Sequence, residues 1–120
     1  MIQFKNPEDA GKWDALDIRV RWLATLAELW FGLRLHPTLI VTDIDTPGVH
    51  MVGSPHYEHR AVDLRLPGDL SEAEEFAQWV NDLFTYGNGL VCVLVGRFDP
   101  HGQHNDHIHL QVPKTLAPSA

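Results

Sequence analysis

Residues 60–66 read Arg-Ala-Val-Asp-Leu-Arg-Leu, and polar and apolar side chains alternate along this stretch. Residues 106–112 read Asp-His-Ile-His-Leu-Gln-Val and alternate in the same way. Successive side chains of a β-strand point to opposite faces, so each stretch predicts a strand with one apolar face in a core. The opposite face would carry Asp63 on the first strand, and His107 and His109 on the second. If the two strands are neighbours, a carboxylate and an imidazole converge on one side of a sheet.

Hydrophobic periodicity predicts two helices and two further strands around this pair. The helices span residues 12–34 and the segment from 71 to the glycines at 87 and 89, and the strands span residues 38–42 and 90–95. Ser71 and Glu74 have the spacing of a capping box at the start of the second helix. Helical spacing also predicts that all four tryptophans lie in the core: Trp13, Trp22, Trp30 and Trp79. The order of elements predicts an α+β fold with a small, mostly antiparallel sheet, an N-terminal helix, and one helix between the two strands with polar faces.

The composition is that of an ordinary globular protein, because 44% of the 120 residues are hydrophobic and 21% are charged. This excludes disordered, coiled-coil and collagen-like chains. We expect residues 1–120 to form a single domain, since a chain of this length can bury one core. No apolar run approaches the ~20 residues of a membrane-spanning helix, which predicts no membrane insertion. The net charge of −7 has the wrong sign for neutralising phosphates, which argues against nucleic acid as a partner.

Two features predict the compartment in which the chain is made. The first residues lack a basic segment followed by an apolar stretch, which predicts synthesis in the cytoplasm without a signal peptide. The single cysteine, Cys92, cannot form an internal disulfide, which fits folding in a reducing compartment.

Seven of the eight histidines fall in two clusters along the chain. His56 lies in a long loop containing glycines and prolines, seven residues before Asp63, and can fold back toward the strand pair. Two histidines and one aspartate suit Zn²⁺, and three protein ligands leave the fourth position for water, as in catalytic zinc sites. Zinc lowers the pKa of that water to about 7. Hydrolysis then needs a proton carrier, for which Asp106 and His107 are placed.

Two other interpretations of these residues stay open. A non-haem iron site also uses two histidines and one carboxylate, but its first histidine and its carboxylate usually have one residue between them, against six between His56 and Asp63. A globular domain with incidental histidines would bind no metal in stoichiometric amount.

Residues 54–63, Ser-Pro-His-Tyr-Glu-His-Arg-Ala-Val-Asp, resemble the SxHxxGxAxD signature of the LAS-type zinc peptidases. Residues 104–109, His-Asn-Asp-His-Ile-His, resemble the second signature of that family, HxH, in the HxxHxH form of its murein endopeptidases. The family also includes D-Ala-D-Ala carboxypeptidases and dipeptidases, phage L-alanyl-D-glutamate endolysins and, as a divergent relative, the hedgehog signalling domain. The resemblance covers about residues 38–112 and implies the small antiparallel core of these proteins.

The resemblance implies that His56, Asp63 and His109 bind Zn²⁺. It leaves two candidates for the general base. Dipeptidases and phage endolysins use an acidic residue three positions before the last ligand, which here is Asp106. Murein endopeptidases use the first histidine of HxH, which here is His107. We favour Asp106 slightly, because a carboxylate at that position does not compete for zinc.

The remaining roles implied by the resemblance concern the substrate. His104 would orient the substrate or a neighbouring side chain. Ser54 would brace the loop of His56 through hydrogen bonds, although a turn residue alone would also explain it. Arg60 and Arg65 are the nearest cations that could bind an acidic stem peptide, and as surface charges on a strand they need no such role.

Two positions depart from the signature of the family. His59 stands where the signature has glycine, and if that position requires positive φ, histidine is tolerated at a cost in stability. Carboxypeptidases of the family carry an arginine near the end of the preceding strand, where this chain has Asp43 and Asp45. These two acids would repel a terminal carboxylate, so an endopeptidase fits better than a carboxypeptidase.

The resemblance therefore implies a zinc-dependent peptidase that hydrolyses an amide bond in the stem peptides of bacterial peptidoglycan. The expected source is a phage or prophage, with the protein acting on the cell wall after release by lysis or as part of a virion. The alternative is a zinc-binding domain without catalytic activity, with a structural or virion-assembly role. The sequence leaves the bond that is cut and the oligomeric state open.

Overall fold

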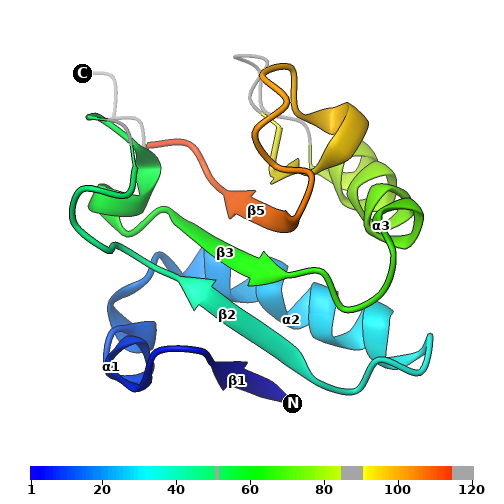
Figure 1. Ribbon diagram of the computed structural model, residues 1–120, viewed down its shortest axis with the longest axis horizontal. Coiled ribbons are helices and arrows are strands. Elements are labelled where there is room, and N and C mark those ends of the chain that lie inside the picture. Colours follow the sequence, from blue (N-terminus) through cyan, green and yellow to red (C-terminus); the bar gives the residue numbers. More distant parts are fainter. Residues whose placement is uncertain (51, 85–90, 115–120) are drawn as a thin grey trace, which may run out of the picture.

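The computed structural model describes residues 1–50, 52–84 and 91–114, which adopt an α+β fold, as predicted from the sequence (Figure 1). The strands are β1 (Ile2–Phe4), β2 (Leu39–Asp43), β3 (Ala61–Arg65), β4 (Val93–Leu94) and β5 (His107–Gln111). The α-helices are α1 (Pro7–Ala10), α2 (Ile18–Gly32) and α3 (Leu70–Leu83), and the 3₁₀-helices are η1 (Trp13–Ala15), η2 (Pro55–Glu58) and η3 (Gly96–Phe98). The predicted helix end at Gly87 and Gly89, and the predicted strand start at Leu90, lie outside the described residues.

The five strands form one mixed sheet in the order β1-β2-β3-β5-β4. β1 runs parallel to β2, whereas β2 with β3, β3 with β5 and β4 with β5 are antiparallel, so the sheet is mostly antiparallel, as predicted. The sequence did not predict β1, because three residues are too few to show an alternating pattern. The two strands with polar faces, β3 and β5, are neighbours in the sheet although α3, β4 and η3 lie between them in the sequence.

The pairing of β3 with β5 determines where the polar side chains lie. Asp63 stands directly opposite His109 in this pair, and Val62 stands opposite Leu110. Since successive side chains alternate between the two faces, both apolar residues point to one side of the sheet and both polar residues to the other. The same register determines which of the other residues of β3 and β5 face each other.

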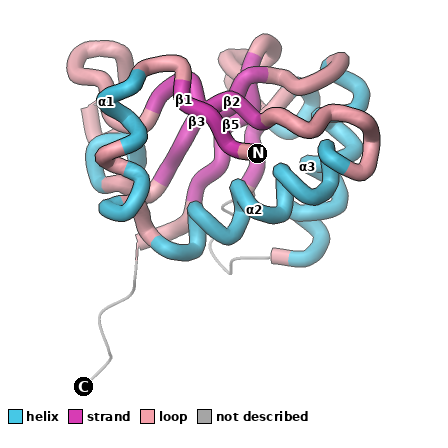
Figure 2. Tube along the Cα trace, turned by 90° about the horizontal axis from the view of Figure 1, so that it is seen from below, coloured by secondary structure: helices cyan, strands magenta, loops and turns pink. Residues whose placement is uncertain are grey.

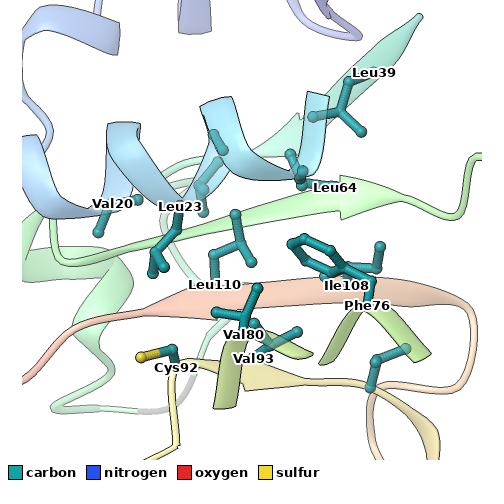
Figure 3. Close-up of a cluster of buried hydrophobic side chains, with 14 of the residues drawn as sticks. Val20, Leu23, Leu39, Leu64, Phe76, Val80, Cys92, Val93, Ile108 and Leu110 are labelled. Atoms are coloured by element: carbon teal, nitrogen blue, oxygen red, sulfur yellow. The ribbon is translucent and has the colours of Figure 1, made fainter. Parts of the chain in front are cut away.

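The helices α2 and α3 cover the apolar face of the sheet (Figure 2). Leu64 and Leu110 on that face belong to one buried cluster with Leu23 of α2 and with Phe76 and Val80 of α3 (Figure 3). Each of these side chains removes apolar surface from water, at roughly 1.5–3 kcal/mol for full burial of a residue of this size. This cluster therefore anchors the sheet on the side away from Asp63 and His109.

Two of the four tryptophans differ from the prediction. Trp30 is buried and Trp13 packs at the edge of the core, but Trp22 is 62% exposed and Trp79 is 38% exposed. Helix α2 carries apolar residues on more than one face: Trp30 packs against Phe76 of α3, whereas Trp22 lies on a face that is exposed. Periodicity alone did not show which of these faces would be covered.

The start of helix α3 also differs from the prediction. Helix α3 begins at Leu70, and the side chain of Asp69 accepts a hydrogen bond of 2.8 Å from the backbone N–H of Glu72. The predicted capping box of Ser71 and Glu74 is wrong, since both residues lie inside the helix. Asp69 is the better cap because its backbone is extended just before the first turn. Its negative carboxylate is also attracted to the partial positive charge at the N-terminus of the helix.

We expect Asp69→Ala to lower the free energy of unfolding by about 1 kcal/mol, because it removes the cap of α3. Ser71→Ala is the matched control and should change it by less than about 0.5 kcal/mol, as for an exposed helical position. Chemical denaturation of the two variants measures both values. Equal losses in the two variants would contradict the assignment of Asp69 as the cap.

Candidate metal centre

Three side chains from separate elements meet on the face of the sheet opposite the helices. Asp63 comes from β3, His109 from β5 and His56 from η2, and the side chains are buried, with residue exposures of 7%, 5% and 2%. His56 Nε2 lies 3.2 Å from Asp63 Oδ1, and His109 Nδ1 lies 3.0 Å from the same oxygen. The two imidazole nitrogens are 3.2 Å apart. The three atoms thus form a nearly equilateral triangle.

The size of this triangle fits one tetrahedral metal ion. With metal–ligand bonds of about 2.0–2.2 Å, ligand atoms in a tetrahedron lie roughly 3.3–3.6 Å apart, close to the observed separations. Two imidazole nitrogens and one carboxylate oxygen are donors that Zn²⁺ accepts. The described residues can therefore hold a divalent metal ion, and the donor set leaves the fourth position of the tetrahedron to a group from outside the triangle.

Hydrogen bonds behind the two histidines leave the correct nitrogens free for the ion. His56 Nδ1 donates to the backbone carbonyl of Ile44 at 2.8 Å, so Nε2 keeps its lone pair. His109 Nε2 lies 2.9 Å from Gln111 Oε1, and Gln111 in turn donates to the carbonyl of Val91 at 2.9 Å. Such partners fix the tautomer and the ring orientation of metal-binding histidines. Gln111 follows His109 by two residues on β5 and therefore shares its face, but the sequence did not predict this role.

The pKa values of Asp63 and His56 depend on each other, because each side chain favours the charged form of the other. Burial disfavours the carboxylate of Asp63, but the hydrogen bonds and charges of His109 and His56 outweigh this and lower its pKa far below the usual range. Burial likewise lowers the pKa of His56, but the hydrogen bond and the charge of Asp63 outweigh it, so the pKa of His56 is raised. Asp63 is therefore ionised, and a metal ion that binds His56 competes with a proton that Asp63 favours on that ring.

The loop that carries His56 is fixed at both ends. Ser54 Oγ accepts a hydrogen bond of 3.2 Å from the backbone N–H of His56, which caps η2. His59 ends η2 with φ of 56°, in the left-handed region that favours glycine. Its Nε2 lies 3.1 Å from Asp45, which also binds Lys12. His59 therefore occupies the strained position and holds the loop to Asp45 instead of joining the triangle.

Asp43 and His50 form a pair beside His56 that the sequence did not assign to the site. Their side chains are hydrogen-bonded to each other, and the ring of His50 stacks on the ring of His56 with 3.7 Å between centroids. One potential ligand atom from each of Asp43, His50, His56 and Asp63 lies within 4.8 Å of the others. His50 lies six residues before His56, and its place in the first histidine cluster was the only signal in the sequence.

The two candidates for the general base form one hydrogen-bonded pair. His107 Nδ1 lies 2.7 Å from Asp106 Oδ1, and His107 Nε2 lies 3.8 Å from Asp63 Oδ2. The hydrogen bond to His107 lowers the pKa of Asp106, whose side chain is 90% exposed. The imidazole therefore lies between Asp106 and the metal triangle.

The two predicted substrate-binding arginines lie outside the cavity next to the triangle. Arg60 donates from Nη1 to the carbonyl of Val112 at 2.7 Å and lies 3.3 Å from Glu58, so its contacts hold the end of β5. Arg65 is exposed at the end of β3 and pairs in register with His107. Their contact with a substrate stays a prediction.

A cavity of about 570 Å³ opens beside the triangle. Its lining includes both histidines of the triangle together with side chains from the loop before β5 and from other segments: His50, Ser54, His56, Leu94, Asp99, His101, Gln103, His104, His109 and Gln111. None of the described residues that line it is a lysine or an arginine. A ligand in the cavity would thus lie next to the fourth position of a bound metal ion. It would meet no permanently positive side chain among the described lining residues.

Comparisons of the chain with models of known protein families, with curated proteins and with solved structures gave no match. Within the described parts of the chain, no helix combines the length and the apolar surface needed to cross a membrane. Support for metal binding by this chain therefore comes from the arrangement of the side chains described above.

We expect His109→Ala to weaken zinc binding by at least about 100-fold, because it removes one ligand of a three-ligand site. His36→Ala is the matched control, since His36 pairs with Glu72 and is not among the ligand atoms that approach one another. Competition titration with a chromophoric chelator measures both affinities. Equal affinities of the two variants would exclude His109 from the metal centre.

Zinc affinity should fall as the pH drops through and below the raised pKa of His56, because the ion must displace a proton from that imidazole. Asp63→Asn removes the negative charge that raises this pKa, so the zinc affinity of the variant should begin to fall at a lower pH. The variant should also bind zinc more weakly at every pH. Titrations across a pH series measure the midpoint. An unchanged midpoint would show that Asp63 does not control the proton on His56.

Proposed function

We propose that the protein is a zinc-dependent peptidase that hydrolyses an amide bond inside the stem peptides of bacterial peptidoglycan. The observation that carries the proposal is the triangle of His56, Asp63 and His109, which has the size of a zinc site with an open fourth position. A cavity large enough for a peptide segment lies beside it. Bound there, Zn²⁺ would polarise a carbonyl group and lower the pKa of water.

His107 is the proposed proton carrier and Asp106 the residue that orients it. The imidazole lies between the exposed Asp106 carboxylate and the triangle, so its Nε2 is the nitrogen nearer the site. In this position it can take a proton from the attacking water and return one to the leaving amine. The geometry thus favours His107 over our initial preference for Asp106, which contacts the site through His107.

The polar groups near the cavity favour an internal peptide bond over the free end of a peptide. A terminal carboxylate would need a basic side chain, and the lining of the cavity, as far as the structure describes it, contains no lysine or arginine. Asp43 already pairs with His50. Asp45 already pairs with both Lys12 and His59. A peptide bond, which carries no net charge, fits this lining better, so we propose an endopeptidase.

The substrate class is supported by the resemblance of residues 54–63 and 104–109 to the two signatures of the LAS-type zinc peptidases. The spacing between the signatures corresponds in the fold to two paired strands with a helical connection. The same resemblance supports a phage or prophage source. The protein would then reach the cell wall after lysis or within a virion.

The test is incubation of the purified, zinc-loaded protein with peptidoglycan, with and without a chelator, followed by detection of new free amino groups. We expect chelator-sensitive release, and a loss of at least about 100-fold in His107→Ala because it lacks the proton carrier. His36→Ala should retain full activity. Mass analysis of the released fragments would identify the bond.

A second function, a zinc-binding domain without catalysis, is favoured by His59. It holds a left-handed conformation at the position where the resembled signature has glycine, which departs from the active members of that family. This alternative would be supported by one zinc ion per chain together with no release of amino groups by the wild-type protein. A structural or virion-assembly role would then replace the peptidase.

A further inference from the structure

Asp99 is a buried carboxylate that the zinc triangle does not use. It follows η3 and is 6% exposed. Its Oδ2 accepts hydrogen bonds from the backbone N–H groups of Gln103 and His104, and its Oδ1 accepts one of 3.0 Å from the N–H of His101. The same Oδ2 lies 2.8 Å from Nδ1 of the His104 ring. One carboxylate therefore fixes both the backbone and the side chain of His104.

This contact determines which nitrogen of His104 carries hydrogen. An ionised carboxylate only accepts hydrogen bonds, so Nδ1 must be the donor. In the neutral ring, Nε2 then has a free lone pair and can accept a hydrogen bond but cannot donate one. Asp99 thereby selects one of the two tautomers of the imidazole.

The ring of His104 lies next to the metal centre and lines the cavity. Its centroid is 4.9 Å from that of His109 and 4.8 Å from that of His107. One of its nitrogens lies within 4.8 Å of potential ligand atoms of Asp63 and His109. Since Nδ1 is occupied by Asp99, the nitrogen available to a ligand in the cavity is Nε2.

The segment between η3 and β5 is held in place at its other end as well. Gly96 has φ of 51°, and a Cβ atom at this position would lie 2.5 Å from Glu74 Oε2. That oxygen accepts a hydrogen bond of 2.7 Å from the N–H of Arg97, and the N–H of Gly96 donates to the carbonyl of His104 at 2.9 Å. The placement of His104 is thus built into the loop.

We propose that Asp99 is a positioning residue that holds His104 with Nε2 as a hydrogen-bond acceptor toward the cavity. The group that binds there would be an O–H or N–H donor next to the fourth position of the metal. In the proposed peptidase, which this assignment assumes, the donor is the attacking water or the N–H of the peptide. The site thus contains two aspartate–histidine pairs, Asp106 with His107 and Asp99 with His104, with different tasks.

The direct test is the tautomer of His104 in the zinc-loaded protein, read from proton–nitrogen correlation NMR of the ring under mildly alkaline conditions. The wild-type protein should show hydrogen on Nδ1 and a bare Nε2 that is not bound to metal. In Asp99→Ala, Nδ1 loses its acceptor, so hydrogen should no longer be confined to Nδ1 and should appear on Nε2. Glu74→Gln is the matched control, because it perturbs the same loop without touching His104, and it should leave the tautomer unchanged.

Hydrogen on Nε2, or zinc bound to it, in the wild-type protein would overturn the proposal even if Asp99→Ala fails to fold. An unchanged tautomer in a folded Asp99→Ala variant would overturn it too. These readings need no hydrolysis, so they separate this proposal from the peptidase itself, whose failure appears as zinc-loaded protein that releases no amines.

Kinetics of the active protein give the functional consequence. Loss of an orienting partner of a site histidine typically reduces activity 10–100-fold, and we expect a loss in this range for Asp99→Ala. His104→Gln should lose a similar amount, and the double variant should lose no more than the larger single loss, because both changes remove the same acceptor. Fully multiplicative losses would show that Asp99 acts independently of His104 and would overturn the assignment.

Discussion

The metal centre depends on one register, the antiparallel pairing that sets Asp63 of β3 opposite His109 of β5. A shift of either strand by one residue would turn its polar side chains into the core and its apolar ones outward. The helices α2 and α3 prevent this, because Leu64 and Leu110 are fully buried beneath them and an unpaired carboxylate in their place would be costly. The packing of one face of the sheet therefore specifies the chemistry of the other.

The parts of the site that could be predicted are those encoded by local periodicity. Alternation along residues 60–66 and 106–112 separated the polar face from the apolar face before any pairing was known. The apolar stripe of α3 gave its position, although not its cap, because Asp69, Ser71 and Glu74 are all plausible capping residues in sequence. The exposure of Trp22 could not be predicted, since it depends on which face of α2 meets the sheet.

The residues that orient the metal ligands could not be predicted, because their partners are distant in sequence. His56 is oriented by the carbonyl of Ile44, 12 residues away, and any residue type offers such a carbonyl. Asp99 precedes His104 by only five residues, but an aspartate in a turn usually caps its own backbone. Only the folded loop shows that this aspartate binds a backbone turn and an imidazole at once.

The buried triangle also links metal binding to folding. Without an ion, Asp63 is paired with the rings of His56 and His109, and its charge raises the pKa of His56, which favours a proton on that ring despite its burial. An ion replaces that proton and brings together one side chain from η2 and two from the sheet, so it should stabilise the loop of His56 more than the strands. The sheet is anchored by its core in any case, whereas η2 is held by its cap at Ser54 and its end at His59. The sheet thus provides the rigid half of the site, and the half supplied by η2 is the one that we expect to respond to a metal ion.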